Sequence, residues 1–154
     1  MAAMASAHLI RRQASSPQAL RIVLLTLLLA LLASCAQTTR NNALDDTLRS
    51  YGSYVRWGEF ELALGFVDPK RLEVAPLSAV DMDRYKQIKV AGYRESAWVS
   101  EGDGLASQIV EIEFINVHTQ AISSIIDRQM WRYDTEAKRW WLVTGLPDIT
   151  AARR

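Results

Sequence analysis

Residues 110–115 read VEIEFI, and apolar residues alternate there with mostly acidic ones. Such an alternation is typical of a half-buried strand, so Val110, Ile112 and Phe114 are expected to face a core. The alternation lies within a longer segment, 105–117, which is rich in β-branched residues. This predicted strand decides the fold, because its apolar face has to be covered by other elements.

Three more segments have the composition of strands, namely 86–99, 121–133 and 139–144. They are separated by EGDG at 101–104, HTQ at 118–120 and DTEAK at 134–138, which are typical of hairpin connections. The four segments therefore predict an antiparallel sheet. Within 121–133 we expect Ile122, Ile126 and Met130 to share the buried face, with Trp131 on the other side.

The cover for the sheet is expected from helices that precede it. An amphipathic helix is predicted by apolar residues at i, i+4, i+7 and i+11, which are Leu44, Leu48, Tyr51 and Val55. Asn42 is expected to cap its start and Gly58 to end it. A second short helix is predicted over 59–67, with Asp68-Pro69 as its stop, and a third short one from Ser78 to Tyr85. The predicted fold class is α+β: an N-terminal helical hairpin packed on a curved antiparallel sheet of about four strands.

Two helices joined at WGEF (57–60), followed by a sheet whose last hairpin reads MWRYDTEAKRWWLV (130–143), resemble the nuclear transport factor two-like cone, also called the cystatin-like fold. The resemblance covers roughly residues 42–149. It implies either a pocket at the open end of the cone or pairing through the sheet. The ketosteroid isomerases of that superfamily place an aspartate base and tyrosine or acid donors in an apolar cavity. Asp127, Tyr93 and Tyr133 lie on predicted strands but match no catalytic motif, so no catalytic residue is predicted.

The N-terminal segment has the layout of a secretory signal. An apolar run, IVLLTLLLALLA at 22–33, follows a stretch that contains Arg11, Arg12 and Arg21 and no acidic residue. A membrane-spanning helix needs about 20 apolar residues, so this run is short for a permanent anchor. We therefore expect a segment that is cleaved.

The end of this run, Leu32-Ala33-Ser34-Cys35, resembles the lipobox of bacterial lipoproteins. The resemblance implies cleavage before Cys35, a diacylglyceryl group on its sulfur, and further acylation of the new amino group. Ala36 then implies sorting to the outer membrane. The alternative is cleavage after Ala33 or Ser34, which leaves the single cysteine as a free thiol.

These features predict the domain organisation: 1–34 signal peptide, 35–42 lipidated tether, 43–150 one α+β cone-like domain, and 151–154 tail. Cleavage leaves 120 of 154 residues; Lys+Arg falls from 18 to 15 with the three signal arginines, against 17 Asp+Glu. That balance argues against a nucleic-acid partner. No linker other than 36–42, AQTTRNN, is evident.

Metal and cofactor sites are not predicted. His118 is the one histidine after the signal, and it falls in a predicted turn. Asp81-Met82-Asp83 begins like a calcium loop, but Lys86 stands where that loop needs glycine, so these aspartates are expected near a helix start. Exposed tryptophan is frequent at binding hot spots, so Trp131, with Trp140 or Trp141, is expected to form a docking surface on the last hairpin.

We therefore expect a membrane-anchored envelope lipoprotein at the periplasmic face of the outer membrane, acting as a non-catalytic module that binds a protein partner, a second copy, or a small apolar ligand. The alternative is a small isomerase or hydratase acting on an apolar substrate. The interior of the cone discriminates between the binding module and the enzyme. An acidic residue with a displaced pKa beside an apolar cavity favours chemistry, whereas a filled interior favours binding through the surface.

Overall fold

The structure, a computed structural model, describes residues 17–151, without the side chains of 17, 19, 20 and 22–36. The chain divides into two compact units, residues 1–40 and 41–154. Within the described residues, no helix combines the length and the apolar content that a membrane crossing requires. The second unit contains the sheet and the core, and it carries the candidate site.

Helix α1 (Pro17–Trp57) contributes the predicted apolar stripe to this unit. Leu44, Leu48, Tyr51 and Val55 are all buried. Gly58, with φ 76°, ends the helix as predicted, and α2 (Phe60–Ala63) and the 3-10 helix η1 (Leu64–Phe66) complete the helical hairpin. The prediction that Asn42 starts the helix is wrong, because residues 36–42 are already helical. That segment contains neither Gly nor Pro, so nothing in it interrupts a helix.

Two short helices lie between the hairpin and the sheet. Helix α4 (Ala79–Tyr85) begins where the sequence predicts, and Ser78 and Asp81 form a reciprocal capping box there. Helix α3 (Pro69–Val74) was not predicted. Asp68, expected as part of a stop, instead caps this new helix by accepting a hydrogen bond from the Lys70 backbone N–H at 3.0 Å.

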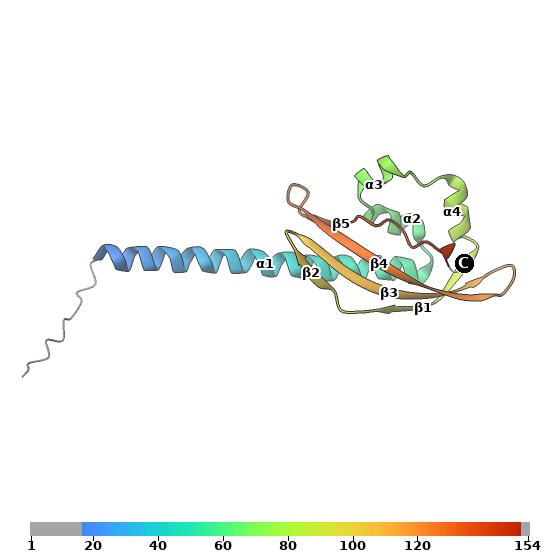
Figure 1. Ribbon diagram of the computed structural model, residues 1–154, viewed down its shortest axis with the longest axis horizontal. Coiled ribbons are helices and arrows are strands. Elements are labelled where there is room, and N and C mark those ends of the chain that lie inside the picture. The colour runs from blue at the N-terminus through green and yellow to red at the C-terminus, as the bar shows by residue number, and fades with distance from the viewer. Residues whose placement is uncertain (1–16, 152–154) are drawn as a thin grey trace, which may run out of the picture. The chain divides into compact units, whose positions relative to one another are not determined.

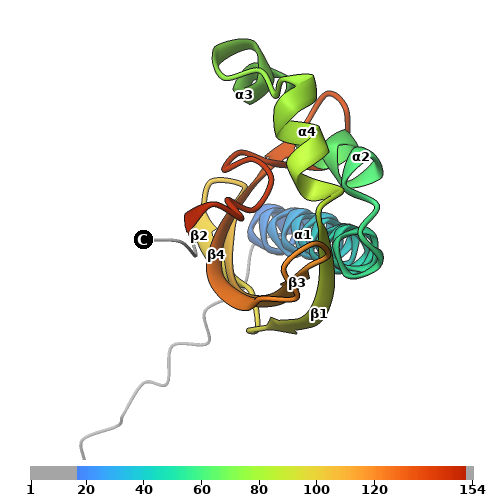
Figure 2. The ribbon, with the colours of Figure 1, turned by 90° about the vertical axis from the view of Figure 1, so that its right-hand side faces the viewer.

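The sheet is antiparallel and strongly curved, as Figures 1 and 2 show. Its strands are β1 (Ile88–Glu95), β2 (Val99–Gly102), β3 (Leu105–Asn116), β4 (Ile122–Asp134) and β5 (Arg139–Leu142). Their order is β1-β3-β4-β5, with β2 also paired to β3. The first predicted strand, 86–99, is interrupted after Glu95, and the three predicted hairpin connections are present. The predicted fold class, helices on a curved, cone-like antiparallel sheet, is confirmed.

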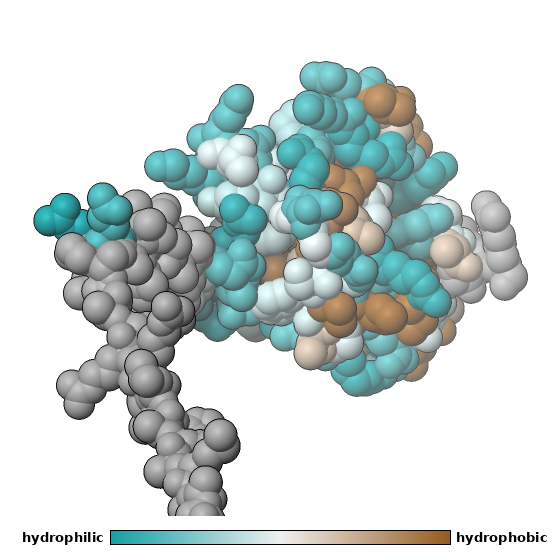
Figure 3. All heavy atoms as spheres, turned by 60° about the vertical axis from the view of Figure 1, so that its left-hand side comes forward, coloured by the Kyte–Doolittle hydropathy of each residue, from teal (hydrophilic) through white to brown (hydrophobic). Residues whose placement is uncertain are grey.

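The core lies between the concave face of the sheet and the helices. Val110, Ile112 and Phe114 are buried on this face, as the alternation in β3 predicts. The ring of Tyr51 on α1 meets the ring of Trp131 on β4 edge to face, with 5.3 Å between centroids. On the side of the molecule shown in Figure 3, hydrophobic side chains form patches among hydrophilic ones. The interior of the cone is thus built chiefly by α1, β3 and β4.

Candidate functional site

The inner face of β4 carries the most unusual residues of the core. Ile125, Gln129 and Trp131 are buried, and Asp127, between them in this row, is half-buried. Alternate residues of a strand share one face, so these four side chains line up along the concave side of the sheet. Two of the four are polar, which is uncommon for buried positions and marks this row as a candidate site.

This arrangement inverts the predicted orientation of β4. Ile122 and Ile126 were expected inside, but they are 69% and 56% exposed. The pairing register explains the difference, because Ile112 stands opposite Ile125, and directly paired residues share a face. Hydropathy alone favoured the wrong side of β4, since its true inner side contains an aspartate and a glutamine.

A hydrogen-bonded chain links the polar groups of this row. The Trp131 indole N–H donates to Gln129 Oε1 at 3.3 Å, and Gln129 Nε2 donates to Asp127 Oδ2 at 2.9 Å. The same amide nitrogen lies 3.4 Å from the hydroxyl of Tyr93 on β1. Gln129 thereby fixes the orientation of the Asp127 carboxyl and connects it to the core.

Three tyrosines from different elements lie near enough to this carboxyl for its charge to raise their pKa values. Burial raises the pKa of Tyr51 well above its usual value, and the charge of Asp127 adds to the shift. Burial also raises the pKa of Tyr93 to about 12, against the hydrogen bond from Gln129, with Asp127 contributing. The pKa of Tyr85 on α4 is raised by burial, then by Asp148 and Asp127. All three phenols therefore stay protonated at neutral pH and can donate hydrogen bonds.

The hydroxyls of two of these tyrosines differ in their partners. Tyr85 donates to the carbonyl oxygen of Pro147 at 2.9 Å, which ties α4 to the C-terminal segment 145–151. The hydroxyl of Tyr51 is fully buried and has no hydrogen-bond partner among the described residues. A buried hydroxyl without a partner costs free energy, so Tyr51 is an unfavourable polar position within this core.

Close packing of α1 against β1 brings Tyr93 to this position. A Cβ atom placed on Gly52 of α1 would lie 3.1 Å from Tyr93 Cε1, which is tighter than ordinary contacts. Glycine therefore allows the tyrosine ring to lie directly on the helix. This contact could be anticipated from sequence only as a glycine inside an otherwise regular helical stripe.

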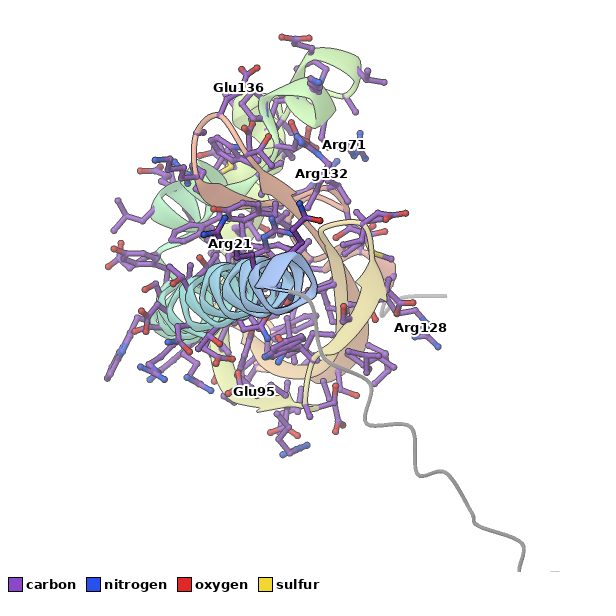
Figure 4. The ribbon with its side chains drawn as sticks, turned by 90° about the vertical axis from the view of Figure 1, so that its left-hand side faces the viewer. Arg21, Arg71, Glu95, Arg128, Arg132 and Glu136 are labelled. Carbon is purple, nitrogen blue, oxygen red and sulfur yellow. The ribbon has the colours of Figure 1, made fainter. Side chains whose placement is uncertain are left out.

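Asp127 has an environment that disfavours its charge. Burial raises the pKa of its carboxyl, and the hydrogen bond from Gln129 offsets part of the shift. No described Lys, Arg or His lies within 4.0 Å of it. The adjacent Arg128 is exposed and points away from the sheet, as Figure 4 shows. Within the described part of the chain, the carboxyl thus has one amide as its hydrogen-bonding partner and no cation beside it.

One cavity reaches this row, and a second, larger one lies next to it. One, of about 280 Å³, is lined by Ser124, Ile125, Ile126, Asp127, Asp148 and Ala151. The other, of about 1010 Å³, lies at the open end of the cone between α4, the ends of β1, β3 and β4, and the C-terminal segment. Ile149 and Thr150 line the large cavity, between two residues that line the small one. The C-terminal segment therefore forms a wall common to both.

The walls of the large cavity are mixed in character. Apolar side chains come from Val80, Ile88, Phe114 and Ile149, and polar ones come from several elements. The polar side chains are Asp83, Arg84, Gln87, Asn116, Thr119, Ser123 and Thr150. Such a lining suits a ligand with an apolar body and a few hydrogen-bonding groups.

The structure separates the tryptophans predicted to form a docking surface. Trp131 is fully buried and Trp140 is 3% exposed, so the prediction that Trp131 stands on the outer side is wrong. This wrong prediction followed from the expected orientation of β4, which is the reverse of the observed one. Trp141 is half-buried beneath the guanidinium of Arg139, 3.8 Å from the ring centroid. Of the two adjacent tryptophans, Trp140 thus belongs to the core.

The remaining candidates are placed as follows. Tyr133 lies beside Trp140, with 5.3 Å between ring centroids, at the other end of β4 from the open cavity. His118 is exposed in the β3–β4 turn, and Asp81 caps α4, as expected. The described residues contain no cluster of three or more side chains of metal-binding type. The lipobox residues Leu32, Ala33, Ser34 and Cys35 lie outside the described side chains.

Comparison with known proteins adds no assignment. No protein-family model matches the sequence, and neither a curated protein nor a solved structure is similar to it. What the structure defines is a class of architecture, helices on a strongly curved antiparallel sheet. The candidate site within it consists of Asp127, Gln129, Tyr51 and Tyr93, and of these Asp127 lines the smaller cavity.

Proposed function

We propose that this protein is a lipid-anchored binding module of a bacterial cell envelope, whose cone takes a small, largely apolar ligand at its open end. The observation that carries the proposal is the cavity of about 1010 Å³, whose apolar wall is formed by side chains such as Ile88, Phe114 and Ile149. Cavities of this size enclose drug-sized ligands. A ligand in the cone accounts for the cavity better than a protein partner at the predicted tryptophan surface, since Trp131 and Trp140 are buried.

The anchor follows from the sequence. The lipobox resemblance places a diacylglyceryl group on Cys35, and Ala36 favours the outer membrane, at its periplasmic face. Each acyl chain contributes about 0.8 kcal/mol per buried methylene, and stable attachment needs more than one chain. Three chains on the mature N-terminus hold the protein at the membrane surface.

Mass spectrometry of the mature N-terminus tests the anchor. We expect a triacylated Cys35 in the membrane fraction, and a Cys35→Ala variant that remains unprocessed while its folded unit is intact. A wild-type protein with an unmodified Cys35, or one cleaved elsewhere, contradicts the anchor.

Binding of the neutral dye Nile red tests the cavity. We expect its fluorescence to increase on binding, and we expect the variant Ser123→Phe, which fills the cavity from the inner side of β4, to weaken binding at least tenfold. Ser100→Phe on β2 is the matched control, because Ser100 is exposed and lines neither cavity. Equal binding by both variants would place the dye elsewhere.

A second candidate function, a small isomerase or hydratase, is favoured by one observation. Asp127 is a half-buried carboxyl with a raised pKa beside a cavity, and such groups are frequent among catalytic bases. Exchange of the α-protons of cyclohexanone for deuterium, followed by NMR, tests this role. Exchange that disappears in Asp127→Asn supports it, and exchange at the solvent rate in both proteins excludes it for this ketone.

A further inference from the structure

We propose that the large cavity binds a neutral carboxylic ester with an apolar body, with Asn116 and Thr119 as hydrogen-bond donors to the ester oxygens. This proposal rests on the proposed function, because it names the ligand class of the same cavity. Both donors and the apolar wall line that one cavity of about 1010 Å³, so a single ligand can contact all of them.

The side-chain amide of Asn116 has its orientation fixed by the turn between β3 and β4. Its Oδ1 accepts hydrogen bonds from the backbone N–H groups of His118 and Thr119, both at 3.0 Å. Because both partners are donors, this end of the amide is the oxygen, and the other end is Nδ2 with two N–H groups. Nδ2 makes no hydrogen bond to another described residue. Asn116, which lines the cavity, therefore offers a ligand donors and no acceptor.

Thr119 adds a second donor at the same turn. Its Oγ1 accepts a hydrogen bond from the backbone N–H of Ala121 at 3.3 Å, and its O–H makes no hydrogen bond to the described residues. Since its backbone N–H is bonded to Asn116 Oδ1, the two residues are neighbours on the cavity wall. Gln87 and Ser123, which line the same cavity, can each donate or accept. The turn thus presents two unused donors side by side.

The charges beside the cavity favour a neutral head group. The charged side chains of the lining are Asp83 and Arg84. Arg84 Nη1 donates to Asp81 Oδ1 at 2.9 Å. Lys86 Nζ donates to Asp83 Oδ1 at 3.1 Å. Each charge of the lining is therefore already paired, and an ionic ligand would leave water without meeting an unpaired opposite charge.

The two donors also select among neutral groups. An ester has two acceptor oxygens and no donor, so it can accept from Asn116 and Thr119 together. A ketone has one acceptor oxygen. An alcohol, an undissociated acid or a primary amide brings a donor of its own that needs a further acceptor. A carboxylic ester therefore matches this pair of donors best.

The apolar wall lies at a suitable distance from the turn. Asn116 is paired with Ile88 across β1 and β3, and Phe114 precedes it on the same face of β3. Successive residues on one face of a strand are about 7 Å apart. An ester whose oxygens contact Asn116 thus places an apolar body against Ile88 and Phe114, which both line the cavity.

The test uses the full chain at pH 7 and three probes with one skeleton. They are methyl 2-naphthoate, the 2-naphthoate anion, and 2-(but-1-en-2-yl)naphthalene, in which carbon replaces both ester oxygens. Displacement of bound Nile red gives their affinities. Asn116→Asp keeps an acceptor for the turn but replaces Nδ2 by oxygen, so it should lower the ratio of ester to hydrocarbon affinity about tenfold.

Gln120→Glu is the matched control. It makes the same change from amide to carboxylate in the same turn, at an exposed residue outside the cavity lining, so it should preserve the ratio. If Asn116→Asp fails to fold, Thr119→Val replaces it, because it removes the O–H donor at nearly constant size and should lower the ratio severalfold. In the wild-type protein the naphthoate anion should bind more weakly than the ester.

Each other outcome has a definite meaning. The ester proposal is overturned by a ratio that the donor variant leaves unchanged, by an equal fall in Gln120→Glu, or by naphthoate binding more tightly than the ester. Bound Nile red that the ester does not displace overturns it as well. These results leave the ligand-binding function standing, whereas absence of binding by Nile red and by all three probes overturns that function too.

Discussion

Asp68 and Asp127 both lie inside the folded unit, yet they differ in their hydrogen-bond donors and in the charges beside them. These factors set the pKa of a carboxyl group. Asp68 is 4% exposed, caps α3, and accepts a hydrogen bond from Arg132 Nη2 at 2.7 Å. Burial opposes its ionisation, but the hydrogen bonds from Arg132 and Lys70 and their charges outweigh burial, so its pKa is lowered. Asp127 has one amide partner and a raised pKa.

The difference shows what each group contributes. Asp68 is fully satisfied by its own chain, so it stabilises the junction of η1, α3 and β4 and has no capacity left for a ligand. Asp127 is held in place by Gln129 but has no counter-ion among the described residues, so its interactions within them are incomplete. Three predictions test this contrast, in order of decreasing effect.

The largest effect is expected for Asp68→Ala. The substitution removes the cap of α3 and leaves Arg132, which is 33% exposed at its side chain, without its partner. We expect the free energy of unfolding to fall by about 3 kcal/mol, less than for a fully buried pair because Arg132 regains some water. Urea denaturation measures it. A loss below about 1 kcal/mol would mean that Asp68 is no more structural than Asp127.

Smaller changes in the free energy of unfolding, of opposite sign, are expected for substitutions of two tyrosines, Tyr85 and Tyr51. Tyr85→Phe leaves the Pro147 carbonyl without its donor and should lower the free energy of unfolding by about 1 kcal/mol. Tyr51→Phe removes a hydroxyl that has no partner and should raise it by about 1 kcal/mol. Thermal melts of both variants test this. Destabilisation by Tyr51→Phe would show that its hydroxyl is already satisfied.

The smallest effect is expected in the pH dependence of the free energy of unfolding. The pKa of Asp127 is higher in the folded protein than the unfolded value of 3.8, so its charge lowers stability above the folded pKa. This cost decreases as pH falls through the folded pKa and is absent below 3.8. Asp127→Asn should therefore stabilise the protein slightly at pH 7 and have no effect near pH 3.

Asp68 provides the control for that measurement, because its pKa shift has the other sign. Its stabilisation is present above the unfolded pKa and is lost as pH falls through the lower folded pKa. Asp68→Asn should therefore cost most at neutral pH and least in strong acid. If both variants changed with pH in the same direction, the contrast between the two carboxylates would be wrong.

The same contrast explains how far the sequence predicts the structure. The alternation in β3, the stripe on α1 and the helix start at Ser78 each depend on local patterns, and each was predicted. The orientation of β4 depends on its pairing with β3, which no local pattern contains. Its inner side has Asp127 and Gln129 where hydropathy expects apolar residues, and a candidate binding site breaks local rules in this way.

The candidate site was therefore found only in part. Asp127 and Tyr93 were singled out as strand residues, but their proximity requires the register of three strands. Tyr51 was predicted only as a member of an apolar stripe, because its hydroxyl matters solely through the partners that it lacks. The start of the helix was misplaced at Asn42, since a helix that continues through 36–42 needs no special residue there.

The unpaired outer edge of β4 affects the tendency of the protein to aggregate at high concentration. Strand β5 pairs with residues 131–134, and no backbone hydrogen bond within the described residues covers the outer edge of β4 over 122–129. An edge that leaves main-chain groups unpaired can recruit strands from neighbouring molecules and start aggregation. Its sequence, ISSIIDRQ, has the β-branched content that favours this, and Arg128 interrupts it with an exposed charge. Exposed charges such as Arg128 disfavour edge-to-edge pairing of strands from neighbouring molecules.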